Sequence, residues 1–140
     1  MIPSSGVLMG VNLDWDAESL AEHRENLGHA PAVTVQFTDL PYDDDTWSHT
    51  EQAVEQVRDN GGVLLLTLEP HGGLDAVSDA VIDRLVADLH GLNQSGVPVV
   101  VRFAHEMNGS WYAWGQRPAQ YREVFRRLAR AVHERAPGSA

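Results

Sequence analysis

Residues 63–103 read VLLLTLEPHGGLDAVSDAVIDRLVADLHGLNQSGVPVVVRF, and this stretch decides the class of fold. It begins and ends with apolar runs, Val63–Leu68 and Val97–Phe103, that lack polar alternation, as is typical of strands buried on both faces of a parallel sheet. Between the runs, apolar residues recur every three or four positions, which is the period of an amphipathic helix: Val77, Val81, Leu85, Leu89 and Leu92. The stretch therefore predicts a strand, a crossover helix and a second, parallel strand.

The same alternation continues on both sides of this stretch. Two further apolar runs precede it, Val7–Leu13 and Ala32–Phe37. Another segment of helical period follows it: Tyr121, Val124, Phe125, Leu128 and Val132. Pro118 suits the first turn of that last helix, and glycines are expected to end the two helices before it: Gly61, Gly62 and Gly96. The strands are roughly 30 residues apart, close to the ~31 residues per unit of a (β/α)₈ barrel of about 250 residues. The 140 residues therefore predict four βα units in one domain.

Two architectures share this order of elements. One is a small open doubly wound domain that is complete in itself, and the other is half of a (β/α)₈ TIM barrel. A glycine-rich phosphate-binding turn after the first strand would favour a nucleotide-binding domain. Here that strand runs into Asn12-Leu13-Asp14-Trp15-Asp16, which has no such glycines. Periodicity alone leaves both architectures open.

The composition excludes several classes of function. A content of 43% hydrophobic and 21% charged residues is ordinary for a globular domain, and the net charge of −10 disfavours binding to nucleic acid or to anionic membranes. The absence of cysteine excludes disulfides, thiolate metal sites and cysteine nucleophiles. No apolar run is long enough for a membrane span, and the N-terminal segment lacks the basic and apolar regions of a signal peptide. The compartment stays unassigned.

Polar and aromatic residues gather where each predicted strand ends. Active sites of βα proteins lie at the carboxyl ends of the strands. The densest cluster here is His105–Gly115, which combines three aromatic residues with a histidine, a carboxylate and an amide. Aromatic rings pack on the C–H faces of sugars, and a carboxyl group can protonate a glycosidic oxygen. The cluster therefore favours a polysaccharide cleft; the alternative is that Trp111, Tyr112 and Trp114 simply cover the end of the sheet.

The other carboxylates can be explained by structure as well as by function. The run Asp43–Asp45 is expected to be a solvated loop. Asp14 could cap the first helix or belong to a site, and Asp39 is a comparable candidate for the site. Glu69 follows the third strand directly and is a further candidate for the site.

A metal site is not expected. His105-Glu106 begins like the zinc-protease motif, but Gly109 stands where that motif requires its second histidine. His49 and His133 lie in segments of helical pattern and are expected at the surface. We therefore predict neither a metal nor a cofactor.

The residues around the densest cluster resemble a known family. The segment RFAHEMNGSWYAWG (Arg102–Gly115), followed by the pattern P-x-x-Y-R-x-x-F-R from Pro118, closely resembles the fourth-strand signature of glycoside hydrolase family 26. Three earlier segments resemble the first three strands of the family: GVNLD (Gly10–Asp14), PAVTVQFTD (Pro31–Asp39) and LLTLEP (Leu65–Pro70). The resemblance therefore covers essentially the whole chain. Leu68 stands where the family often has a tryptophan. The family comprises mainly β-1,4-mannanases, with some mixed-linkage glucanases and xylanases.

The resemblance implies a (β/α)₈ barrel whose acid/base lies on the fourth strand and whose nucleophile lies on the seventh. Carried over, it makes Glu106 the acid/base and His105 a catalytic-site residue that orients the acid or the nucleophile. Trp111 would line the sugar subsite next to the scissile bond. The remaining candidates for substrate binding are Arg102, Asn108, Tyr112, Trp114 and, by a looser match, His71.

The resemblance also implies a substrate and a missing partner. The substrate would be a polysaccharide or oligosaccharide, above all β-mannan, hydrolysed with retention, and the family is often secreted. A retaining glycosidase needs two carboxyl groups about 5–5.5 Å apart. Glu69 or Asp39 is not expected to replace the nucleophile, because that group must face the anomeric carbon across the barrel mouth.

We therefore expect residues 1–140 to be the N-terminal part of a family 26 catalytic domain. This half barrel would lack the nucleophile and be inactive alone, with strand edges unpaired and one sheet face short of cover. The alternative function is a non-catalytic half barrel that binds carbohydrate.

Overall fold

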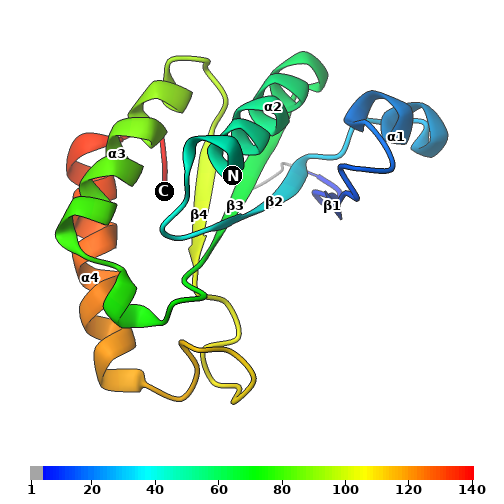
Figure 1. The fold of residues 1–140 in the computed structure, drawn as a ribbon. Helices are drawn as coiled ribbons and strands as arrows, with labels where there is room; N and C mark the ends of the chain where they lie inside the picture. The colour runs from blue at the N-terminus through cyan, green and yellow to red at the C-terminus, as the bar shows by residue number, and fades with distance from the viewer. Residues whose placement is uncertain (1–4) are drawn as a thin grey trace.

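The computed structural model describes residues 5–140 and consists of four successive βα units (Figure 1). Met1–Ser4, part of the segment considered above for a signal peptide, lie outside the described residues. The elements in chain order are β1 (Gly10–Asn12), α1 (Leu20–Leu27), β2 (Val33–Asp39), α2 (Asp44–Asn60), β3 (Val63–Glu69), the short 3₁₀ helix η1 (Leu74–Ala76), α3 (Asp79–Asn93), β4 (Val99–Phe103) and α4 (Pro118–Arg135). None of the helices between residues 5 and 140 is both long and apolar enough to cross a bilayer.

The four strands form one parallel sheet in the order β1-β2-β3-β4. The register of β2 and β3 places Asp39 beside Glu69, so these two strands end level with each other. Beyond β4, the last residues of the chain pair with it in parallel: the N–H of Ala140 donates to the carbonyl of Val99 at 2.9 Å, and the N–H of Val101 donates to the carbonyl of Ala140 at 2.7 Å. β4 therefore has backbone partners on both sides.

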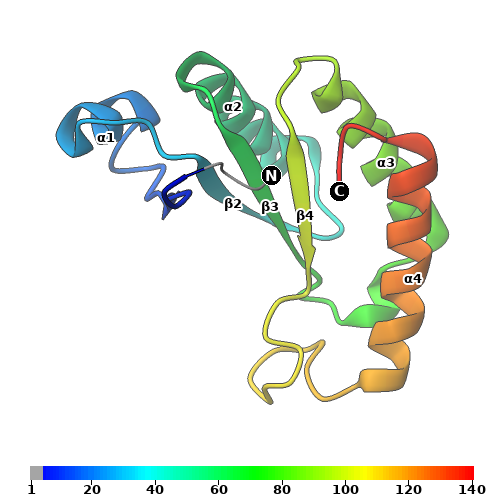
Figure 2. The same cartoon turned by 180° about the vertical axis from the view of Figure 1, so that it is seen from behind.

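The helices cover one face of the sheet. Leu64, Leu66 and Leu68 of β3 are completely buried on that face. Helix α2 lies in front of the sheet in Figure 1 and behind it in Figure 2. Apolar side chains from three helices complete the core: Ala53, Val54, Val57, Ile82, Leu85, Leu89, Val124, Leu128 and Val132. The opposite face carries side chains that are only partly buried: Val35, Phe37, Leu65, Val100 and Arg102.

This winding distinguishes the two architectures that the sequence left open. A doubly wound sheet reverses its strand order and carries helices on both faces. Here the strand order follows the chain and the helices lie on one face, which is the winding of a (β/α) barrel. The fold is that of a half barrel.

Local signals explain most element boundaries, and two of them correct the sequence analysis. The acidic run Asp43–Asp45 is the start of α2 rather than a loop, because the Asp43 carboxylate accepts the N–H of Thr46 at 2.8 Å as an N-cap. Asp14 does not cap the first helix. Ser19 does, in a capping box with Glu22.

The first strand is shorter than expected. An apolar run over 7–13 predicted it, but only residues 10–12 pair with β2. Val7 is 86% exposed, and Leu8 and Met9 are also exposed. An apolar run becomes a buried strand only where a neighbouring strand and a covering helix are in register with it. Of residues 7–9, Met9 alone has a backbone partner beside β2, because its carbonyl accepts the N–H of Ala32 at 2.7 Å.

Candidate active site

The loop 104–117 follows β4 and extends beyond the end of the sheet toward which the strands point (Figure 2). Its first residues adopt a backbone conformation that L side chains rarely use: φ is 46° at Ala104 and 54° at Glu106. Such residues cost about 1–3 kcal/mol each and cluster at functional sites. Three backbone hydrogen bonds within the loop stabilise it: Gly109 N–H donates to Glu106, Gly115 N–H to Tyr112 and Gln116 N–H to Met107.

Glu106 lies in the exposed part of this loop. The indole N–H of Trp111 donates to its Oε2 at 2.7 Å. Trp111 is itself 67% exposed, so its ring is free to contact a ligand. The sequence-predicted acid/base and its expected neighbouring tryptophan therefore form one surface unit.

His105 points to the inner side of the same loop and is enclosed by aromatic rings. Its Nε2 lies 3.2 Å from the hydroxyl of Tyr112, whose ring stacks on Trp114 at 4.2 Å between centroids. The Trp114 N–H donates to the backbone carbonyl of His105 at 2.7 Å. Trp114 is completely buried, which leaves it no surface for a ligand in this structure. Its hydrogen bond instead holds the backbone of the histidine in place.

Side chains from two other strands reach this histidine. Glu69 Oε1, at the end of β3, lies 3.9 Å from His105 Nδ1, and its Oε2 lies 3.7 Å from His71 Nε2. His71 Nε2 is in turn 3.5 Å from Asp39 Oδ1 at the end of β2. These distances are within electrostatic range but long for hydrogen bonds, and the buried Nδ1 of His105 has no hydrogen-bond partner among the described residues. The result is a row of acidic and imidazole groups across three strand ends.

Two of the predicted substrate-binding residues lie apart from this row. Arg102 is on the uncovered face of the sheet, where its Nε donates to Thr67 Oγ1 at 3.0 Å and its guanidinium lies 5.3 Å from the centre of the Phe37 ring. Asn108 is exposed in the loop, and its side chain makes no hydrogen bond within residues 5–140.

The sequence analysis did not assign every residue of the site. Glu69 was one of several candidate carboxylates, and Phe37, whose ring meets His105 edge-on at 5.7 Å, was treated only as part of a strand. One signal could have singled out Glu69: neighbouring parallel strands end level with each other, so a residue at the end of the third strand lies near the residues that follow the fourth. No group of three or more histidine, cysteine or acidic side chains within 5–140 is arranged to hold a metal ion.

Comparison with known proteins agrees with this geometry. Residues 68–136, which include β4, the loop and all of α4, match the sequence model of glycosyl hydrolase family 26. This segment, just under half of the chain, belongs to glycosyl hydrolase family 26.

Two relatives of the chain are enzymes of Bacillus subtilis, both named mannan endo-1,4-beta-mannosidase. The one from strain 168 is 30% identical over 59 residues, which cover 36% of this chain and 16% of that enzyme. The other is 31% identical over 65 residues, which cover 40% of this chain and 18% of that enzyme. The matched segments are thus a small share of each mannosidase.

A solved structure of GH26A from Muricauda sp. MAR_2010_75 superposes on the present chain with a TM-score of 0.68. The superposition covers 95% of this chain and 55% of that one, at 19% sequence identity. The chain therefore has the fold of about half of that structure, as the half barrel requires.

Proposed function

We propose that Glu106 is the general acid/base of a retaining glycosidase that hydrolyses β-1,4-mannan. The observation that carries the proposal is the exposed Glu106–Trp111 unit at the carboxyl end of β4, in a loop with three left-handed residues, Ala104, Glu106 and Gln116. The choice of mannan rests on the two mannan endo-1,4-beta-mannosidases to which the chain is similar.

The proposed mechanism uses Glu106 twice. Its carboxyl group first gives a proton to the glycosidic oxygen while a second carboxylate attacks the anomeric carbon and the aglycone leaves. Glu106 then takes a proton from water, whose oxygen displaces the enzyme carboxylate from the sugar. The Trp111 N–H suits both steps, because a neutral donor bonds to the carboxyl oxygen in either protonation state and so fixes the side chain.

His105 is proposed to act as a positioning residue. Tyr112 and Trp114 fix its ring and backbone, and Glu69 faces its Nδ1. The nucleophile is proposed to come from a seventh strand, which would follow the four strands of residues 5–140. Glu69 would then orient His105 toward that nucleophile.

The test of the acid role is made in a catalytic domain that joins this chain to four further βα units. Glu106→Ala should lower turnover of mannan about 100-fold or more, the range of general acid catalysis. Hydrolysis of an aryl β-mannoside with a nitrophenolate leaving group should fall much less, because that group leaves without a proton. Glu134→Ala, an exposed carboxylate on α4, is the control and should change neither rate. Equal losses on both substrates would argue against the acid role.

The second candidate function is carbohydrate binding without chemistry, which the exposed Trp111 ring favours. Calorimetric titration of the 140-residue chain with mannohexaose, beside an assay of reducing ends, separates the two activities. Binding without release of reducing ends is expected for this chain. Release would contradict the placement of the nucleophile on a seventh strand.

A further inference from the structure

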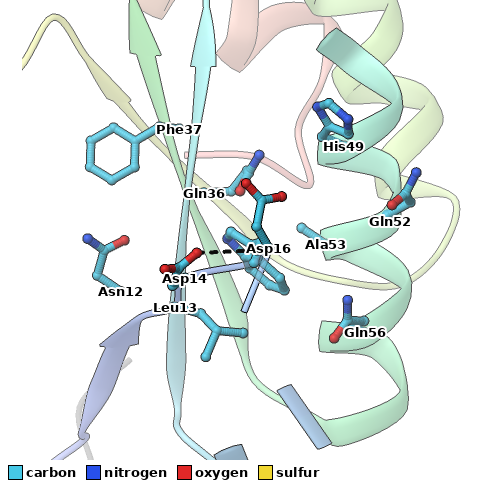
Figure 3. A pocket seen from close by; sticks show the side chains of 11 residues that line it. Asn12, Leu13, Asp14, Asp16, Gln36, Phe37, His49, Gln52, Ala53 and Gln56 are labelled. Atoms are coloured by element: carbon cyan, nitrogen blue, oxygen red, sulfur yellow. Dashed lines mark hydrogen bonds between the residues drawn. The ribbon is translucent and has the colours of Figure 1, made fainter. Parts of the chain in front are cut away.

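A pocket of about 410 Å³ lies between the loop after β1 and the helix α2 (Figure 3). It opens where it does because β1 ends at Asn12, so β2 has a neighbouring strand beside Gln36 only on its β3 side. Its size is within the range of small-molecule sites. Its walls include Asp14 and Asp16 from the loop and His49 and Gln52 from the helix.

Hydrogen bonds made by two of the lining side chains fix the walls in place. The indole N–H of Trp15 donates to the carbonyl of Val35 at 3.1 Å, which attaches the loop to β2. The Gln56 side chain accepts the N–H of Leu20 at 2.8 Å, which ties α2 to the start of α1. The pocket is therefore formed before any ligand arrives.

One side chain in the pocket lacks a partner. Gln36 is only 8% exposed, yet none of the hydrogen bonds of residues 5–140 involves its amide. Figure 3 shows it between the sheet and α2, near Asp16. Its register neighbour on β3 is Leu66, so the helix-covered face is otherwise apolar at this level. The amide atoms themselves are not sealed from solvent, so they are free to bond a ligand that offers donors and acceptors.

The chemistry of the lining selects the class of ligand. No lysine or arginine lines the pocket, which disfavours phosphates and sugar acids. The polar groups are amides, carboxylates and one imidazole, which bind hydroxyl groups. We propose that this pocket binds a neutral sugar unit, as a subsite separate from Glu106.

The position of the pocket supports a shared ligand. Phe37 lines it and also contacts the ring of His105, so the pocket borders the candidate active site along the same edge of the sheet. A chain of linked sugars could occupy both. The inference rests on the proposed function only for the choice of β-1,4-mannotriose as the first probe.

Nuclear magnetic resonance of the ¹⁵N-labelled 140-residue chain tests the proposal. Mannotriose should shift the side-chain amide signals of Gln36 and Gln52. Gln52→Ala, an exposed change on α2, should weaken this binding at least tenfold. Gln36→Leu should do the same, and it extends the leucine pattern of the core. Gln94→Leu, at the exposed end of α3, is the matched control and should leave the affinity unchanged.

Further titrations distinguish a failure of this inference from a failure of the proposed function. Trp111→Ala should leave the Gln36 shifts in place if the subsite is separate. Shifts of Gln36 with cellotriose but not mannotriose would keep the sugar pocket and overturn the mannan assignment. No shift with either sugar would overturn the inference, whatever happens at Trp111. Shifts caused only by magnesium or calcium chloride at Asp14 and Asp16 would overturn it in favour of a cation site.

Discussion

At the scale of single residues, two tryptophans three positions apart have opposite roles. Trp111 is largely exposed and bonds only to Glu106, whereas Trp114 is completely buried and bonds to the backbone of His105. Sequence alone treats the two as equal members of one aromatic cluster. The structure makes one a surface for a ligand and the other a support for the histidine.

This contrast predicts different stabilities for the two alanine variants. Trp114→Ala should lower the free energy of unfolding by about 3–5 kcal/mol, because it empties a closed cavity beneath the loop. Trp111→Ala should lower it by about 0.5 kcal/mol or less, as is usual for exposed positions. Urea denaturation followed by circular dichroism measures both. Similar losses in the two variants would mean that the buried packing of Trp114 is wrong.

At the scale of elements, α1, α2 and α3 each start where a side chain accepts a free backbone N–H group, whereas α4 starts at Pro118 without such a cap. Asp43 does so for α2, and hydrogen bonding from the backbone N–H of Thr46 lowers the pKa of the Asp43 carboxyl below its usual value. A carboxyl whose pKa is lower in the folded state stabilises the fold above its unfolded pKa of about 3.9. That stabilisation is lost as the pH falls through the lower, folded pKa.

The cap therefore predicts a pH-dependent effect of Asp43→Ala. At pH 7 the variant should melt at a lower temperature than the parent chain, and the difference should shrink below about pH 4, where the parent carboxyl becomes protonated. Differential scanning calorimetry between pH 2.5 and 7 follows it. Asp45→Ala, in the first turn of the same helix but not at the cap, is the control and should show a smaller difference. A difference independent of pH would contradict the capping role of the carboxylate.

At the scale of the whole molecule, the helices cover only one face of the sheet. The other face carries Phe37, Leu65 and Val100 at partial exposure, and β1 is a strand of three residues at the edge. The exposed apolar residues Val7, Leu8 and Met9 directly precede that edge. Unpaired strand edges and apolar patches favour association with other chains.

We therefore expect the 140-residue chain to self-associate with increasing concentration. Sedimentation velocity over a hundredfold range of concentration should show a rising average mass. Replacing Leu8 and Met9 by lysine should reduce the association, because charged residues at an edge oppose pairing. The same two changes should leave the secondary structure unaltered, since neither residue belongs to a strand or helix. A chain that stays monomeric throughout would show that the open face and edge are tolerated in water.

The sequence by itself determined the order of elements and the position of the candidate acid. Val63–Leu68 and Val97–Phe103 predicted β3 and β4 closely, because an apolar run or a helical period reflects forces between near neighbours in the chain. Glu106 stood out because polar and aromatic residues gather after the fourth apolar run and because the segment around it resembles the family signature. These are local properties, and local properties can be read from a string of residues.

Only the tertiary structure decided which groups meet. Glu69 faces His105 because β3 and β4 pair in one particular register. Trp114 is buried because the loop folds over it. Val7 and Leu8 lie outside the sheet, since pairing needs a partner as well as an apolar side chain. The pocket beside Gln36 likewise depends on where β1 ends. Contacts between distant residues depend on register and packing, which no single segment of the sequence contains.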